Sequence, residues 1–88
     1  MRKAYSFRGR VQGVGFRVTA RSVAAGFAIT GFVRNEPDGS VWLEAQGDPA
    51  EVERFLEALR RAMGPSIKTV TSRDMPAEPA ETGFQIQH

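Results

Sequence analysis

The stretch GRVQGVGFR, Gly9 to Arg17, decides how the first part of this chain folds. It places Gly13, Gly15 and Arg17 at the point where a predicted strand passes into a predicted helix. Glycine adopts left-handed backbone conformations at little cost, so such a turn can direct several backbone N–H groups into one concavity. The start of the helix adds unpaired N–H donors, and Arg17 adds a planar cationic group. The stretch therefore predicts a site for a small tetrahedral anion, most naturally a phosphate group.

The residues on either side of this stretch follow two different periods. Over residues 4–11 apolar and polar side chains alternate, which predicts a half-buried strand with Tyr5, Phe7 and Val11 facing the core. After the glycines, apolar residues recur every three or four positions, as in an amphipathic helix. These residues are Phe16, Ala20, Val23, Ala24 and Phe27. A strand, a loop and a helix are therefore predicted in that order.

The middle of the chain reads as a hairpin. Residues 29–35 and 41–46 have the pattern of two strands, with Val41, Leu43 and Ala45 on the inward side of the second. Between them, Glu36-Pro37-Asp38-Gly39 is typical of a turn.

A second helix is predicted from Asp48, which can cap it, with Pro49 at the first helical position and Glu51 as a capping-box partner. Gly64-Pro65 ends this helix. We then expect a fourth strand over 67–73, a surface loop over 75–82 and a short last strand around Phe84 and Ile86.

The resulting order is βαββαβ with one additional strand. Right-handed crossovers place both helices on one face of a mostly antiparallel sheet. The predicted fold class is therefore a ferredoxin-like α+β sandwich with a short extra C-terminal strand, and we expect residues 1–88 to form a single domain. This fold alone does not specify a function.

Composition narrows the classes of function. The chain contains no cysteine, which excludes disulfides and thiol chemistry, and no stretch resembles a membrane span or a signal peptide. We therefore expect a cytoplasmic protein that does not bind membranes. The net charge of +2 suits a small anionic substrate but is too small to indicate nucleic-acid binding. We expect a monomer.

Two motifs together resemble those of the acylphosphatases. The first is G-x-V-Q-G-V-x-F-R, matched over Gly9–Arg17. The second is G-aromatic-V-x-N-x-x-x-G-x-V with a closing glycine, and it is matched by Gly31, Asn35, Gly39, Val41 and Gly47. The two motifs cover about a third of the chain, and the order of strands and helices agrees with the fold of that family. Two linked motifs at a compatible interval are much more specific than either alone.

The resemblance implies a role for each site residue. The backbone N–H groups of the loop would bind the substrate's phosphate group, Arg17 would bind it through its side chain, and Asn35 would position the attacking water. The loop residues are Gln12, Gly13, Val14, Gly15, Phe16 and Arg17. The implied reaction is hydrolysis of a small acyl phosphate to a carboxylate and phosphate, without a metal ion or other cofactor.

Several alternatives stay open from the residues alone. Arg17 can be a solvated arginine whose charge opposes the helix dipole, and Asn35 can be a turn residue. At the level of function, the alternatives are a non-catalytic phosphate-binding or regulatory module, an RNA-binding domain, and a piece of a larger carbamoyl-transfer protein. An RNA-binding sheet would carry stacking aromatic residues on its central strands, but Tyr5 and Phe7 are predicted to face the core.

Three further expectations can be compared with the structure. The family usually has a glycine before the second strand, where this chain has Ala28. Either the first helix ends early with Gly26 in a left-handed conformation, or Ala28 adopts that conformation. We expect Arg34 to be solvated on the face opposite Asn35, and Trp42 to pack against neighbouring side chains on that face.

Overall fold

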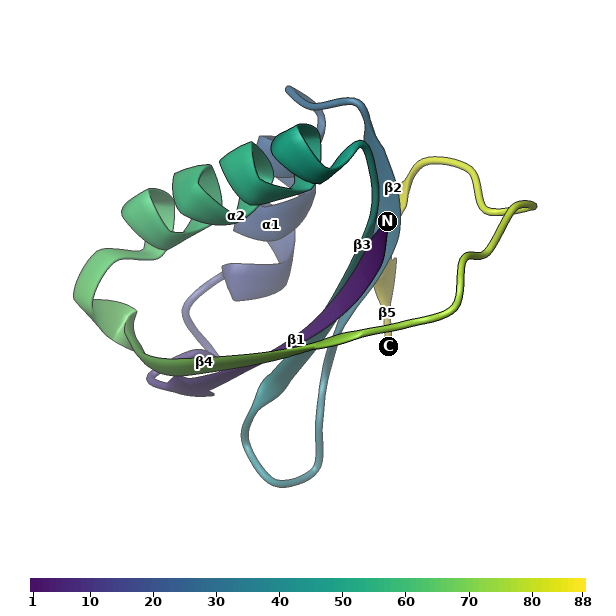
Figure 1. Ribbon diagram of the computed structural model, residues 1–88. Helices are drawn as coiled ribbons and strands as arrows, with labels where there is room; N and C mark the ends of the chain where they lie inside the picture. The colour runs from purple at the N-terminus through teal and green to yellow at the C-terminus, as the bar shows by residue number, and fades with distance from the viewer.

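A five-stranded sheet forms the framework of the structure, a computed structural model that describes residues 1–88 (Figure 1). Its strands are β1 (Arg2–Gly9), β2 (Ile29–Asn35), β3 (Val41–Gly47), β4 (Ile67–Asp74) and β5 (Phe84–Gln87). They lie in the order β4-β1-β3-β2-β5. Every neighbouring pair is antiparallel except β2 and β5, which are parallel. The mostly antiparallel sheet with a short additional strand is therefore confirmed.

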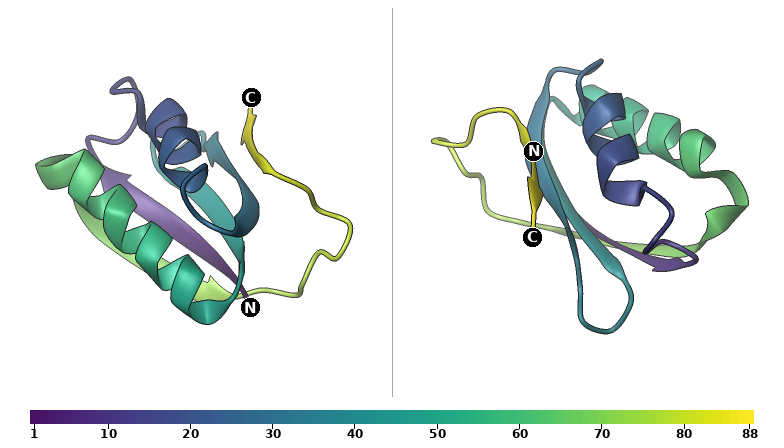
Figure 2. Two further views of the ribbon diagram at one scale, coloured as in Figure 1. Left: turned by 90° about the horizontal axis from the view of Figure 1, so that it is seen from above. Right: turned by 180° about the vertical axis from the view of Figure 1, so that it is seen from behind.

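Both helices cover the same face of the sheet, as the three views of Figures 1 and 2 show. They are α1 (Phe16–Ala24) and α2 (Pro49–Met63), and a short 3₁₀ turn, η1 (Gly64–Ser66), follows α2. Neither helix is long and apolar enough to cross a membrane. The predicted ferredoxin-like α+β fold is confirmed.

The core lies between the sheet and the two helices. Its strand side includes Phe7, Val33 and Leu43, and its helix side includes Phe16 and Phe55, all of them essentially inaccessible to solvent. The alternation of apolar and polar residues therefore identified the inward faces of β1 and β3 correctly. Close packing of these side chains fixes where each strand and helix ends, and so fixes the loops between them.

The opposite face of the sheet is only partly open. Arg2 is 4% exposed, and its Nε and Nη1 atoms each donate a hydrogen bond of 2.8 Å, to Glu44 and Glu81 respectively. The backbone N–H of Glu78 in turn donates to Gln46 on β3 at 2.7 Å. The segment between β4 and β5 is thus fastened to this face, a contact that alternation along β1 and β3 did not predict.

Two local predictions were wrong. Helix α1 does end early, but neither Gly26 nor Ala28 has a positive φ; instead the N–H groups of Gly26 and Phe27 donate to carbonyl oxygens three residues earlier. Asp48 caps α2 through the N–H of Ala50, as predicted. Glu51, however, makes no capping box, because its carboxylate accepts a hydrogen bond from the N–H of Ala28 at 2.9 Å. One side chain therefore joins the start of α2 to the segment that follows α1.

Candidate functional site

The loop between β1 and α1 is held at both ends by buried side chains. Val11 and Phe16 are only 1% and 2% exposed, and the ring of Phe16 lies 5.0 Å from that of Phe7, centre to centre. Between these anchors, Gly13 and Gly15 have φ angles of 76° and 77°. This conformation is strained for residues with a Cβ atom, which explains the glycines. The loop is therefore fixed in position while its backbone is exposed.

The backbone N–H groups of this loop have no partners within the protein. None of residues 12–18 donates a backbone hydrogen bond, and Gly15 at the helix N-cap offers no side chain to cap α1. The first turn of α1 also contains no acidic residue. Unpaired N–H groups at a helix start, together with the helix dipole, favour a bound anion.

A hollow of about 120 Å³ lies beside this loop and reaches the end of β2. Its lining residues come from two parts of the chain, residues 11–18 and the end of β2: Val11, Gly13, Gly15, Phe16, Arg17, Val18 and Asn35. Five of the predicted site residues are thus brought together. Gln12 and Val14 do not line the hollow, and Val14 is exposed.

Gln12 has a structural contact that the sequence did not reveal. Its side-chain Nε2 donates hydrogen bonds of 2.8 Å to the carbonyl oxygens of both Glu36 and Ser40. These two residues frame the β2–β3 turn, which begins directly after Asn35. Gln12 therefore connects the glycine loop to the turn that follows Asn35, and this fixes the two parts of the hollow relative to each other.

Asn35 ends β2 and lies on the same side of the sheet as the buried Val33. Its side chain makes no hydrogen bond within the protein, so its amide is available to a ligand or a water molecule. Arg34 faces the other side of the sheet, as predicted. It is not simply solvated, however, because its Nε donates to Glu36 at 2.6 Å.

Arg17 extends from the first turn of α1 without a carboxylate partner. Its Nη1 atom lies 3.4 Å from Nδ1 of His88, the residue that follows β5. The guanidinium group is therefore free of salt bridges, and Arg17 is one of the residues that line the hollow. The sequence could not place His88 here, because the parallel pairing of β5 with β2 brings it from the other end of the chain.

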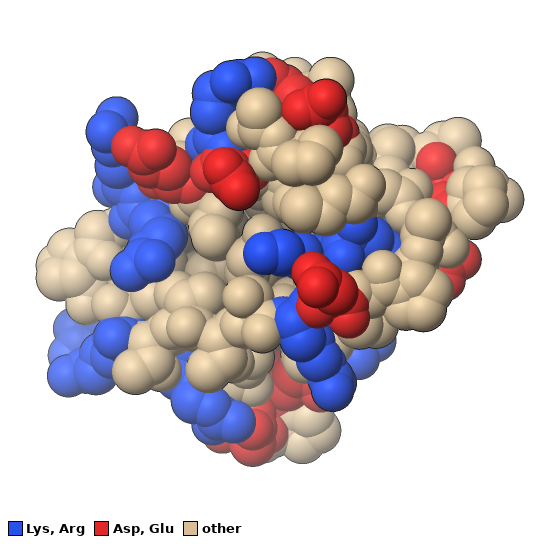
Figure 3. Space-filling model, in the orientation of Figure 1, with Lys and Arg blue, Asp and Glu red and all other residues tan.

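Charges elsewhere on the surface are mixed. On the face shown in Figure 3, basic and acidic side chains are interspersed rather than gathered into one stripe.

Within the β2–β3 turn, Asp38 accepts hydrogen bonds from the hydroxyl and the N–H of Ser40 and a further one from Arg8. These hydrogen bonds lower the pKa of Asp38 to about 2. No group of three or more His, Cys, Asp or Glu side chains is arranged to hold a metal ion.

Comparisons with known proteins agree on one family. The acylphosphatase family model matches residues 3–86. An acylphosphatase of Lacticaseibacillus paracasei is 37% identical over 81 residues, which cover 90% of this chain and 87% of that protein. The crystal structure of acylphosphatase from Bacillus subtilis superposes with a TM-score of 0.88 at 28% identity, covering 99% of this chain and 98% of that one. The T. kodakarensis HypF structure has a TM-score of 0.86 at 24% identity, covering all of this chain but only 12% of that one, and it shows the fold alone.

Proposed function

Because this chain belongs to the acylphosphatase family, we propose that residues 12–17 bind the phosphate group of a small acyl phosphate and that Asn35 positions the water that attacks it. The chain is an acylphosphatase, so its substrates are small acyl phosphates and its products are a carboxylate and inorganic phosphate. The assignment of each step to a residue is our proposal.

The reaction requires charge compensation and positioning more than a strong base. Water attacks phosphorus, the bond between phosphorus and the acyl oxygen breaks, and the carboxylate leaves with the electron pair. A carboxylate is a good leaving group, so it does not need protonation by a general acid. In the transition state, negative charge is spread over the three equatorial phosphoryl oxygens. The unpaired N–H groups and the guanidinium group of Arg17 would stabilise that charge.

Asn35 is suited to hold the nucleophile. An amide side chain both donates and accepts hydrogen bonds, so it can orient a water molecule without taking its proton. Correct orientation of two reactants accounts for a large part of many enzymatic accelerations. In this mechanism the proton of the water passes to the phosphate product or to solvent, and no phosphorylated enzyme forms.

One observation carries the proposal: a single hollow gathers Gly13, Gly15, Arg17 and Asn35. The loop and the end of β2 are far apart in the sequence, and the side chain of Gln12 joins their neighbourhoods. Without Asn35 the site would be an anion site alone. With it, the same hollow contains groups for both the phosphate and the water.

The test is hydrolysis of benzoyl phosphate by the purified protein with and without a chelator. We expect turnover that a chelator does not reduce, because Arg17 and the N–H groups compensate the charge that a metal ion would otherwise compensate. Activity that disappears with chelator and returns with magnesium would overturn the mechanism. Phosphate binding without any turnover would instead favour a non-catalytic phosphate-binding module.

A further inference from the structure

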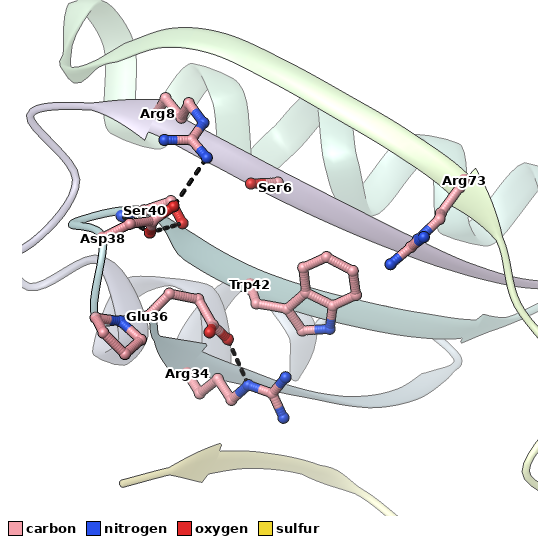
Figure 4. Close-up of a pocket in the computed structure, with 9 residues that line it drawn as sticks. Ser6, Arg8, Arg34, Glu36, Asp38, Ser40, Trp42 and Arg73 are labelled. Atoms are coloured by element: carbon pink, nitrogen blue, oxygen red, sulfur yellow. Dashed lines mark hydrogen bonds and ion pairs between the residues drawn. The ribbon is translucent and has the colours of Figure 1, made fainter.

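A second hollow, of about 470 Å³, lies on the face of the sheet that the helices leave uncovered (Figure 4). It is bordered by side chains of β1, β2, β3 and β4 and by the β2–β3 turn. It shares no lining residue with the hollow that contains Arg17 and Asn35. Its volume lies within the range of about 300–1,000 Å³ that is usual for small-molecule sites.

The register of the strands creates this hollow. Ser6 on β1 lies opposite Trp42 on β3, and Trp42 lies opposite Arg34 on β2. Because the side chain of Ser6 is small, space is left beside the indole ring of Trp42, which Figure 4 shows nearly face-on between Ser6, Arg34 and Arg73. Nε1 of Trp42 donates to Glu44 at 2.9 Å, which fixes the orientation of the ring.

Charge in the hollow is unbalanced in favour of the cations. Two of its three arginines are held by carboxylates: Arg8 contacts Asp38 at 2.9 Å, and Arg34 contacts Glu36 at 2.6 Å. Arg73 forms no salt bridge, and its guanidinium carbon lies 5.3 Å from the centre of the Trp42 ring. The hollow therefore combines an aromatic face with one arginine whose charge is uncompensated, and Arg73 is exposed enough to turn toward a ligand.

We propose that this hollow binds a small planar aromatic anion of the nucleoside monophosphate class, with its ring stacked on Trp42 and its anionic group paired with Arg73. Aromatic rings stack favourably on indole, and the guanidinium group is well shaped to bind phosphate oxygens in pairs. A long single-stranded nucleic acid fits less well. Sheets that bind RNA stack two or three bases, whereas the exposed face of β1 and β3 offers only Trp42.

The experiment is a titration of isotopically labelled protein with adenosine 5′-monophosphate, followed by the chemical shifts of N–H groups. Trp42 is the only tryptophan, so the single indole N–H resonance reports on this hollow directly. We expect that resonance and the backbone amides of Ser40 and Arg73 to shift in a saturable way. Inorganic phosphate alone should shift the amides of residues 12–17 and leave the indole resonance in place.

Two variants and one control distinguish the contribution of the Trp42 ring to nucleotide binding from that of the Arg73 charge. Trp42→Ala should weaken binding of the nucleotide about tenfold or more through lost stacking. Arg73→Gln should weaken binding of the nucleotide by about tenfold and leave binding of uncharged adenosine unchanged, since only the nucleotide carries the anion. Arg60→Gln, which removes an exposed arginine from α2, should change neither affinity. Arg73 is exposed on an edge strand, so its variant tests the proposal even if Trp42→Ala unfolds.

Three results would overturn the proposal. The first is nucleotide-induced shifts confined to residues 12–17, which would mean binding through phosphate at the other site. The second is an indole shift that inorganic phosphate reproduces in full, which would remove the role of the ring. The third is much tighter and strongly salt-dependent binding of a short single-stranded RNA, which would make the sheet a polynucleotide surface.

Discussion

Arg17 stands at the start of α1, where its positive charge opposes the helix dipole. No carboxylate compensates it, and the N–H groups around it are unpaired. Such a concentration of donors and positive charge is unfavourable unless an anion occupies it. The placement of this residue is therefore best explained by what it binds rather than by what it stabilises.

Arg17→Ala should reduce both phosphate binding and turnover. The substitution removes a charged group that contacts the phosphate before and during the reaction, and related arginine contacts in phosphoryl transfer contribute on the order of 10³-fold or more to turnover. Steady-state kinetics with benzoyl phosphate and inhibition by phosphate measure the two effects. Arg60→Ala, on the exposed side of α2, serves as the control. If Arg17→Ala kept full turnover, the arginine would be a solvated surface residue.

At the scale of elements, the loop between β1 and α1 and the turn between β2 and β3 act as one unit. The side chain of Gln12 joins them through two carbonyl oxygens, and Ser40 and Asp38 brace the turn from within. The sequence identified both segments but not their connection. A glutamine within a glycine loop carries no local signal for a contact with residues 24 and 28 positions away.

Gln12→Ala should disturb catalysis although the side chain of Gln12 does not line the hollow and its backbone N–H is kept. Losing both hydrogen bonds frees the turn, and we expect turnover to fall by roughly tenfold because misplacement of reacting groups is costly. Stability should fall by about 1–2 kcal/mol. Gln12→Glu, which cannot donate these bonds, should behave similarly. Unchanged turnover in both variants would show that the loop and the turn hold their positions independently.

The turn also makes stability depend on pH. The pKa of Asp38 is lowered from 3.8 to about 2 in the folded state, so its contribution is present above about pH 4 and is lost as the pH falls through 2. Asp38→Asn should therefore lower the urea midpoint of unfolding at pH 7. The difference from the unmodified protein should shrink as the pH approaches 2. If the difference in urea midpoint were unchanged at that pH, the charge of Asp38 would not contribute to the stability of the folded protein.

At the scale of the whole molecule, local sequence patterns predicted the arrangement of strands and helices. They did not predict the buried polar contacts. Alternation and helical periodicity depend on near neighbours, and they gave the strands, the helices and the inward residues such as Phe7 and Leu43 correctly. Arg2, by contrast, is buried through Glu44 and Glu81, which lie 42 and 79 positions away. Its partners depend on strand register and on the path of the segment after β4. No local pattern encodes either of these, and the same holds for the contact between Glu51 and Ala28.

Arg2→Met should cost about 3 kcal/mol of stability, because it leaves two carboxylates without a cation on a nearly closed face. That is a large part of the total for a domain of this size. Chemical denaturation measures the loss. Glu81→Gln, which keeps an acceptor for the guanidinium group, should cost less. A loss below about 0.5 kcal/mol for Arg2→Met would mean that the segment after β4 is not fastened by this residue.

The central claim, that one hollow binds the phosphate and the water through different groups, is tested most directly by Asn35→Ala. Turnover of benzoyl phosphate should fall by roughly 10²–10³-fold while the inhibition constant for inorganic phosphate stays nearly unchanged, because Asn35 contacts the water and not the anion. Gln85→Ala, which removes an exposed amide from β5, should change neither quantity. If Asn35→Ala instead unfolds the protein, or weakens phosphate binding while turnover is kept, Asn35 is a structural turn residue and the account is contradicted.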